Sequence, residues 1–265
     1  MSASRTRRTR RSLAQRLRVY WIVGVVAAGA LVWGGWTLAT LPVFHLRSLS
    51  VSGLDRVSAA DVRARAAIDA HTNVWLQDRG AMARRIEAIP YVETARISIR
   101  PPADVEIAVT ERVAEGCVHD PSGQFTIDAE RRVLALGCAD APPFVYDMRA
   151  PIDARPGAFV ADPELEALQA DARALAAGTN RYRAFGYDEF GELDATLVDG
   201  IHVRFGDDAD LARKESLVGP ILAQLGPRAG TVVALDLRAP AAPVVQFRPL
   251  RPAHPHSHPH VLDRQ

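Results

Sequence analysis

The longest apolar run in the chain covers residues 19–44, where no side chain is charged and Leu, Val, Ile, Ala, Gly and Trp predominate. A helix of about 20 apolar residues crosses the hydrocarbon core of a bilayer, and this run exceeds that length. Aromatic residues, which are enriched at both interfaces of a membrane, lie toward its two ends: Tyr20, Trp21, Trp33 and Trp36. The pattern therefore predicts a single transmembrane helix at residues 19–43.

A cleaved signal peptide is the competing interpretation, because Ala28, Gly29 and Ala30 offer small residues at a suitable spacing. The apolar core of a signal peptide is usually about 7–15 residues long, whereas this run continues through Leu41. Cleavage after Ala30 would leave an apolar N-terminus, so the pattern favours an uncleaved anchor.

The next segment, residues 44–112, has apolar positions that predict the element order β-α-α-β-β. Alternating apolar and polar residues predict the strands, Ser58 and Asp78 are candidate N-caps of the two helices, and Pro90 ends the second helix. The predicted elements are strands at 44–52, 92–100 and 105–110, a helix at 59–70 and a second helix between Asp78 and Pro90.

The region 113–249 predicts a mixed α/β domain with an antiparallel-rich sheet, so the fold class of the whole chain is α+β. Four prolines between residues 139 and 161 predict an irregular crossing there, and Asp162-Pro163 predicts a helix start. The predicted strands are 117–119, 125–128, 133–136, 183–187, 193–197, 202–205, 232–237 and 244–247, and a further helix is expected at 208–225. Residues 250–265 are rich in Pro and His, which predicts a disordered tail.

Charge is divided unevenly along the chain. The net charge is +1, yet residues 1–18 hold seven arginines and no acid, so the other residues together are net acidic at −6. Basic residues beside a membrane helix stay on the cytoplasmic side, which predicts a cytoplasmic tail at 1–18 and an extracytoplasmic body. This distribution argues against a uniformly basic nucleic-acid-binding protein, and no nucleic-acid partner is expected.

The sequence contains none of the H-E-x-x-H, C-x-x-C, G-x-S-x-G and P-loop motifs. We therefore predict no enzymatic activity, no cofactor, no metal site and no small-molecule substrate. The tail histidines His254, His256, His258 and His260 have no cysteine or acidic co-ligand nearby, which favours a disordered tail over a metal site.

The two cysteines, Cys117 and Cys138, lie across a predicted hairpin. An extracytoplasmic location permits a disulfide between them. Free buried thiols are the alternative, because small buried cysteines are common in cores.

Several sequence blocks, in order, resemble the FtsQ/DivIB family of bacterial cell-division proteins. Residues 49–53 (LSVSG) resemble its first-strand I-x-V-x-G, and residues 100–112 resemble its R-x-x-P-x-x-L-x-I-x-V-x-E-R block. Further blocks lie at 73–76 (NVWL), 89–97 (IPYVETARI), 199–206 (DGIHVRFG) and 235–238 (LDLR). Residues 125–128 (FTID) also match, but the glycine that usually follows is absent and Glu130 and Arg131 lie in that region.

This resemblance implies a POTRA domain at 44–112 and an FtsQ-type β domain at 113–249. It implies a non-enzymatic, bitopic scaffold of the divisome, located in the cytoplasmic membrane at the division septum. Such a scaffold binds the small bitopic proteins FtsB and FtsL and helps control septal peptidoglycan synthesis. The alternative is another single-pass POTRA protein that acts in envelope protein assembly or secretion.

In this family the last strand of the β domain accepts a segment of FtsB, so the resemblance assigns an edge strand as the partner-binding site. An exposed edge offers unpaired N–H and C=O groups to an incoming strand. The candidate residues here are Arg238, Val244, Val245, Gln246 and Phe247. Phe247 has two interpretations, an aromatic anchor for the partner or a plain core aromatic.

Overall fold

The computed structural model describes residues 13–138 and 142–248. They form two compact units with the boundary between Glu111 and Arg112, one residue before the predicted end of the first domain. Most of the predicted basic segment 1–18 and all of the predicted tail 250–265 lie outside the described residues.

The first element is the long helix α1 (Leu13–Ala39). Its stretch Arg18–Ala39 is, among the described residues, the one helix long and apolar enough to cross a membrane. The helix ends at Ala39 rather than at the predicted residue 43, and the 3₁₀ turn η1 (Pro42–Phe44) follows. Pro42 has no N–H to donate to a preceding turn, so the helix cannot continue through it.

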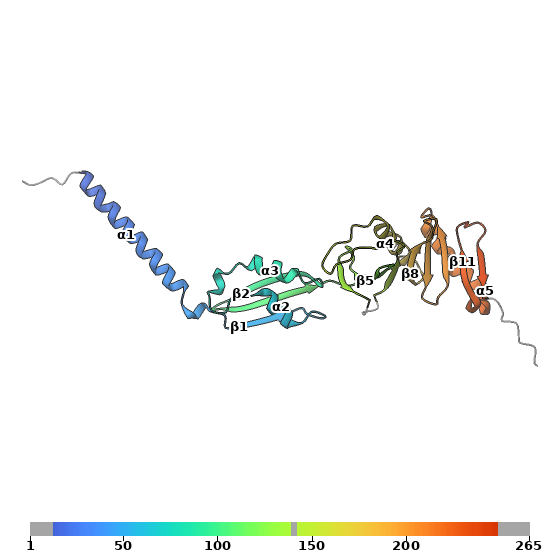
Figure 1. Cartoon of the computed structure of the whole chain (residues 1–265), viewed down its shortest axis with the longest axis horizontal. Coiled ribbons are helices and arrows are strands. Elements are labelled where there is room, and N and C mark those ends of the chain that lie inside the picture. The colour runs from blue at the N-terminus through green and yellow to red at the C-terminus, as the bar shows by residue number, and fades with distance from the viewer. Residues whose placement is uncertain (1–12, 139–141, 249–265) are drawn as a thin grey trace, which may run out of the picture. The chain divides into compact units, whose positions relative to one another are not determined.

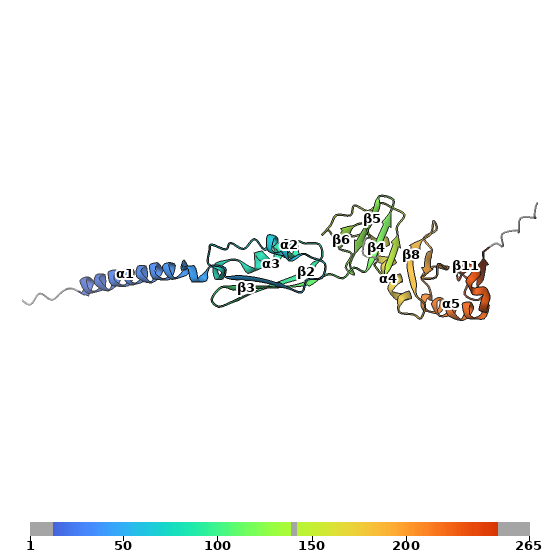
Figure 2. The same cartoon turned by 90° about the horizontal axis from the view of Figure 1, so that it is seen from below.

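The rest of the first unit is a three-stranded sheet with two helices. Strands β1 (Ser48–Ser52), β3 (Asp104–Glu111) and β2 (Val92–Arg100) lie in the order β1-β3-β2, with β1 parallel and β2 antiparallel to β3. Figure 2 shows α2 (Ala59–Ala66) and α3 (Arg79–Glu87) together on one side of this sheet. The predicted β-α-α-β-β order is therefore confirmed.

The core of this unit lies between the sheet and the two helices. Val105, Ile107 and Val109 alternate along β3 and are buried against Val62 and Ile86 of the helices. Helix α2 is shorter than predicted because Ala67 adopts a left-handed conformation and caps it.

Position 53, the last of the LSVSG block, requires glycine for two structural reasons. Its φ is +80°, and a Cβ there would collide with the backbone carbonyl oxygen of Val109. The turn at the end of β1 thus needs both the positive φ and the missing side chain of glycine.

The second unit is built on a nine-stranded sheet, whose labelled strands β5, β8 and β11 follow one another in Figure 1. The strand order is β12-β11-β10-β9-β8-β7-β4-β5-β6. Strand bounds are β4 (Gly116–Asp120), β5 (Gly123–Ile127), β6 (Val133–Leu136), β7 (Phe144–Asp147), β8 (Tyr182–Tyr187), β9 (Leu193–Leu197), β10 (His202–Gly206), β11 (Val232–Asp236) and β12 (Val244–Phe247). Helices α4 (Pro163–Ala176) and α5 (Leu211–Leu225) and the 3₁₀ turn η3 (Gly226–Thr231) complete it.

Strand β7 corrects the prediction of an irregular crossing at 139–161. It has four residues and follows Pro142 and Pro143, so its local pattern is too short and too proline-rich to predict a strand. In the structure it pairs in parallel with both β4 and β8, in the interior of the sheet. Phe144, Val145 and Tyr146 suit a strand, and pairing on both sides stabilises this short segment as one despite the prolines before it.

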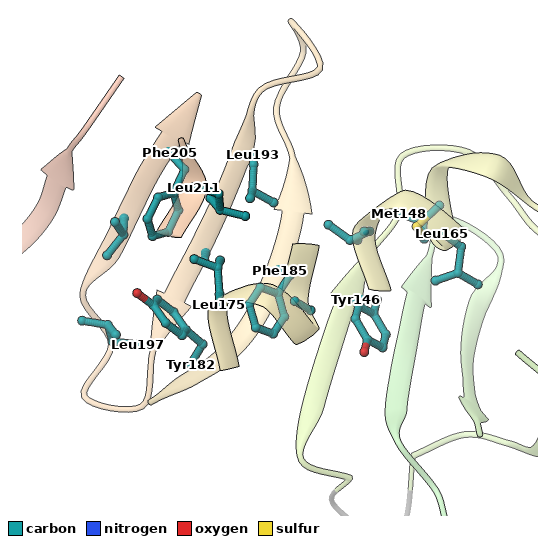
Figure 3. Close-up of a cluster of buried hydrophobic side chains, with 14 of the residues drawn as sticks. Tyr146, Met148, Leu165, Leu175, Tyr182, Phe185, Leu193, Leu197, Phe205 and Leu211 are labelled. Carbon is teal, nitrogen blue, oxygen red and sulfur yellow. The ribbon is translucent and has the colours of Figure 1, made fainter. Parts of the chain in front are cut away.

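The core of the second unit is aromatic where α4 packs on the sheet. Tyr146, Phe185 and Tyr182 come from β7 and β8, and Figure 3 shows Leu175 of α4 beside Phe185. The ring centroids of Tyr146 and Phe185 are 6.2 Å apart, and those of Tyr182 and Phe185 are 5.9 Å apart. This packing holds the centre of the sheet, to which both edges are attached.

The turn after β5 forms without the glycine that usually follows the FTID block in the family it resembles. Arg131 takes the left-handed conformation, with φ +66°, at an expected cost of about 1 kcal/mol. The carboxylate of Asp128 compensates by accepting backbone N–H bonds from Glu130 at 3.0 Å and Arg132 at 2.7 Å. Arg112 also donates to Asp128, at 2.8 Å, so this turn is tied to the start of the unit.

Candidate protein-interaction edge

Strand β12 forms one edge of the nine-stranded sheet, with β11 as its neighbour. The two strands are antiparallel, with Val244 opposite Asp236 and Phe247 opposite Val232. In an antiparallel pair alternate residues point their N–H and C=O groups away from the partner strand. Within residues 142–248 and 13–138 no strand covers this outer side of β12.

The side chains of β12 alternate between solvent and core. Val244, with 55% of its surface exposed, and Gln246 are exposed. Val245 and Phe247 are half-buried and pack against the main hydrophobic core. The edge therefore presents an apolar and an amide side chain to solvent, while the other two side chains hold the strand in place.

Phe247 is covered on one side by a cation. The guanidinium carbon of Arg228, in η3, lies 4.6 Å from the centroid of its ring, which suits a cation–π contact. The structure thus gives Phe247 a role in attaching β12 to the core. Arg228 could not be identified from the sequence, because a 3₁₀ turn gives no periodic signal that would place it over the ring.

Arg238 lies just beyond β11, near the beginning of β12. Its Nε and Nη2 donate to the carboxylate of Asp236 at 3.1 and 2.7 Å, and its Nη1 donates to Glu192 at 3.3 Å. The hydrogen bond from Arg238 holds the pKa of Asp236 below its ordinary value, although partial burial of the carboxyl acts to raise it. Gly206 leaves room for this arginine, because a Cβ there would lie 2.9 Å from its Cγ.

The structure brings all five predicted residues to one edge. Arg238 is next to Asp236, which pairs with Val244, and Val245, Gln246 and Phe247 continue along β12. Glu192 could not be identified from the sequence as a partner of Arg238, because the two are 46 positions apart and no local pattern connects them.

Two buried charged residues of α5 support the strands behind this edge. Lys214, whose side chain is 3% exposed, donates to the carboxylate of Asp207 at 2.6 Å and to its backbone oxygen at 2.9 Å. Glu215 accepts bonds from the backbone N–H groups of Thr179 and Asn180, both at 3.0 Å. These bonds fix α5 to the loops before β8 and after β10.

The opposite edge of the sheet, β6, is partly covered by another backbone segment. The N–H of Val133 in β6 donates to the carbonyl of Ala158 at 2.9 Å, and the N–H of Gly157 donates back to Val133 at 2.7 Å. Val160 adds a third bond, to Arg131 at 3.0 Å. The segment around residues 157–160 thus occupies part of the outer side of β6.

Cys117 and Cys138 form a disulfide in the structure, with Cα atoms 5.6 Å apart, a separation that suits such a bond. His119 brings a ring nitrogen within 4.8 Å of both sulfur atoms. Sulfur atoms joined to each other provide no thiolate, so this group has no metal-binding capacity while the bond is intact. The β12 edge offers outward-pointing backbone N–H and C=O groups that a further strand can pair with.

A family model described as "POTRA domain, FtsQ-type" matches residues 44–112. Cell division protein FtsQ of Mycolicibacterium smegmatis is 27% identical over 241 residues, which cover 91% of this chain and 68% of that protein. FtsQ of Mycobacteroides abscessus is 25% identical over 88% of this chain and 70% of its own length.

Cell division protein FtsQ of Myxococcus fulvus is 36% identical over 104 residues, or 37% of this chain. The match spans only 36% of the length of that protein. With the β-α-α-β-β unit, the long apolar helix and a second unit that ends in an edge strand, the chain is similar to bacterial cell division proteins FtsQ, and its residues 44–112 match the FtsQ-type POTRA domain.

Proposed function

We propose that this protein is a bitopic scaffold of the divisome, which binds FtsB- and FtsL-type proteins and thereby helps control septal peptidoglycan synthesis. It links early and late division proteins by binding them and has no catalytic role. The observation that carries the proposal is the uncovered edge of β12, in a sheet whose other edge is covered at Val133.

Strand addition at β12 would give the partner both affinity and register. Its backbone would bond to the outer side of β12, while its side chains contact the exposed Val244 and Gln246. Arg238, kept in place by Asp236 and Glu192, would offer a charged contact beside the first residues of β12.

The proposed topology places the N-terminus in the cytoplasm and both folded units outside it. The arginines of residues 1–18 support this orientation, and a disulfide such as Cys117–Cys138 is typical of an oxidising, extracytoplasmic environment. The proposed location is the cytoplasmic membrane at the division septum.

A matched pair of variants tests the edge. Val244→Glu changes an apolar side chain that is 55% exposed on β12, and Leu136→Glu changes one that is 65% exposed on β6, the opposite edge. We expect the first variant to weaken binding of the FtsB-type protein of the same genome about tenfold or more, because a charge on an edge strand opposes pairing. Co-purification from membranes with the full chain measures this, and Leu136→Glu should bind like the parent.

Equal binding by both variants would show that β12 is not the partner site. Phe247→Asp is a less selective change, because Phe247 also packs against the core and would unfold the strand. Depletion of the protein, followed by microscopy, tests the cellular role, since normal septation in depleted cells contradicts it.

A further inference from the structure

Two large apolar side chains are exposed at one loop of the first unit. Trp75 and Leu76, in the 3₁₀ turn η2 (Val74–Leu76) between α2 and α3, are 40% and 72% exposed. Surface loops of soluble domains are usually polar, so neighbouring exposed Trp and Leu side chains indicate a surface that contacts something else.

The loop is held firmly with these side chains outward. The Asn73 carboxamide oxygen accepts the N–H of Trp75 at 2.9 Å, and Val74, 1% exposed, anchors the turn in the core. The Gln77 amide donates to the carbonyl of Asp69 at 2.7 Å, which closes the base of the loop. The exposure of Trp75 and Leu76 is therefore a consequence of specific bonds.

The loop lies at the end of the unit where the chain arrives from α1. The indole N–H of Trp75 donates to the carbonyl of Pro102 at 2.9 Å, and the adjacent Ala103 accepts the N–H of Arg47 at 3.1 Å. Arg47 immediately precedes β1. Asn73 also donates its side-chain amide to the carbonyl of Ala39, the last residue of α1, at 2.8 Å.

The short connection between α1 and β1 is apolar as well. Leu41 and Val43 are 44% and 49% exposed, and they follow the end of the membrane-length helix by two and four residues. The exposed apolar residues of this end are thus Leu41, Val43, Trp75 and Leu76, which we call the juxtamembrane patch.

We propose that the juxtamembrane patch inserts into the interfacial layer of the bilayer beside α1, so that the POTRA domain rests on the membrane that anchors it. The inference rests on α1 spanning the membrane. Lipid is the favoured occupant because the patch is continuous with the end of α1, where the headgroup region begins.

The chemistry of the patch suits that layer. Tryptophan is enriched at membrane interfaces, where its ring contacts acyl chains and its N–H needs a polar partner. In Trp75 the carbonyl of Pro102 already satisfies the N–H, so the ring can enter the interface without an unpaired donor. Exposed Arg47 lies nearby and can contact lipid phosphates.

Fluorescence quenching tests the proposal on the full chain. Replacing Trp21, Trp33 and Trp36 by Phe leaves Trp75 as the one tryptophan. The protein is reconstituted in phosphatidylcholine nanodiscs, without any partner protein, that contain a lipid with a nitroxide on its headgroup. A matched control adds Trp75→Phe and Thr110→Trp, because exposed Thr110 lies in the same unit, at the end of β3 far from Pro102 and the Trp75 loop.

We expect the nitroxide lipid to remove about half of the Trp75 fluorescence and less than about a tenth of the control signal. Leu76→Asp should weaken the quenching of Trp75, because a charge in the patch opposes insertion, and circular dichroism checks that this variant is folded. Equal quenching of Trp75 and the control would overturn the proposal. Shielding of Trp75 from iodide only after FtsB- and FtsL-type proteins are added would also overturn it, in favour of a protein-binding patch.

Discussion

The two edges of the nine-stranded sheet differ in whether another backbone segment bonds to their outward N–H and C=O groups. At β6, the segment around residues 157–160 supplies backbone bonds to Arg131 and Val133. At β12, the described chain supplies none, although the strand is firmly attached to β11 and the core. An uncovered edge promotes aggregation unless it is used. The contrast shows that β12 is the more open of the two edges among the described residues, which supports it as the proposed partner site.

The two edges are also supported by different interactions. The disulfide joins β4 to the residue after the β6 hairpin, so the covered edge has a covalent link. The end of the free edge is held instead by the ion pairs of Arg238 with Asp236 and Glu192. Side-chain contacts leave the outer backbone of β12 open, and that is the condition for strand addition.

Removing the disulfide near the β6 edge should have the largest effect on the free energy of unfolding. Cys117→Ser with Cys138→Ser releases a loop with a sequence separation of 21, which should lower the free energy of unfolding by about 3 kcal/mol. Urea unfolding of the full chain in detergent, with and without reductant, measures the change.

Partner binding at β12 should not change, since Cys117 and Cys138 lie toward the β6 end of the strand order, away from β12. An oxidised parent protein that unfolds at the same urea concentration as its reduced form would contradict the prediction.

A smaller effect is expected from uncovering β6. Gly157 has φ +84° and donates its N–H to Val133, so Gly157→Pro removes the donor and forces a negative φ. We expect a loss of about 2 kcal/mol in unfolding free energy. The N–H of Val133 should exchange faster as well, because it donates to the carbonyl of Ala158, the residue next to the substitution. Gly157→Ala is the matched control, because it keeps the N–H and should cost only about 1 kcal/mol for the left-handed backbone. Identical exchange at Val133 in both variants would show that the hydrogen bond does not cover the edge.

The smallest effect is a pH dependence confined to the free edge. The pKa of Asp236 is lowered in the folded state, chiefly by the hydrogen bond from Arg238. The ionised Asp236 carboxylate therefore contributes fully to stability above its unfolded pKa of about 4. This contribution is lost as the pH falls through the pKa of the folded state. Because the Arg238 side chain is 46% exposed, we expect less than about 1 kcal/mol.

NMR titration of the Asp236 carboxyl measures this pKa, and Arg238→Ala should raise it. The backbone bonds at β6 do not titrate, so the NMR chemical shift of the Val133 amide should not follow the Asp236 titration. An unchanged Asp236 pKa in Arg238→Ala would refute the assignment.

Much of the first unit could be predicted from sequence, because its signals are local. Strand β2 has the predicted bounds, Val92–Arg100, and the side chains of Ser58 and Asp78 cap α2 and α3 as expected. Alternation and capping act over a few residues, so a single sequence reveals them. The candidate edge residues came from family resemblance, and no periodic pattern alone would have selected them.

The arrangement of the second unit depended on contacts that no local pattern contains. Strand β7 exists because β4 and β8 pair with it on either side, and β6 is covered because residues 157–160 return to it. Arg238 likewise contacts Glu192, 46 positions away in the sequence, because the folded sheet brings the two together.

The sequence by itself determined the membrane-length helix, the uneven charge and the β-α-α-β-β domain, since each is a short-range property of composition or period. Only the tertiary structure decided which sheet edge is free and which apolar loop is exposed beside α1. Exposure is the outcome of long-range packing: a residue such as Trp75 or Val244 looks like a core residue in the sequence, and the rest of the fold decides whether anything covers it.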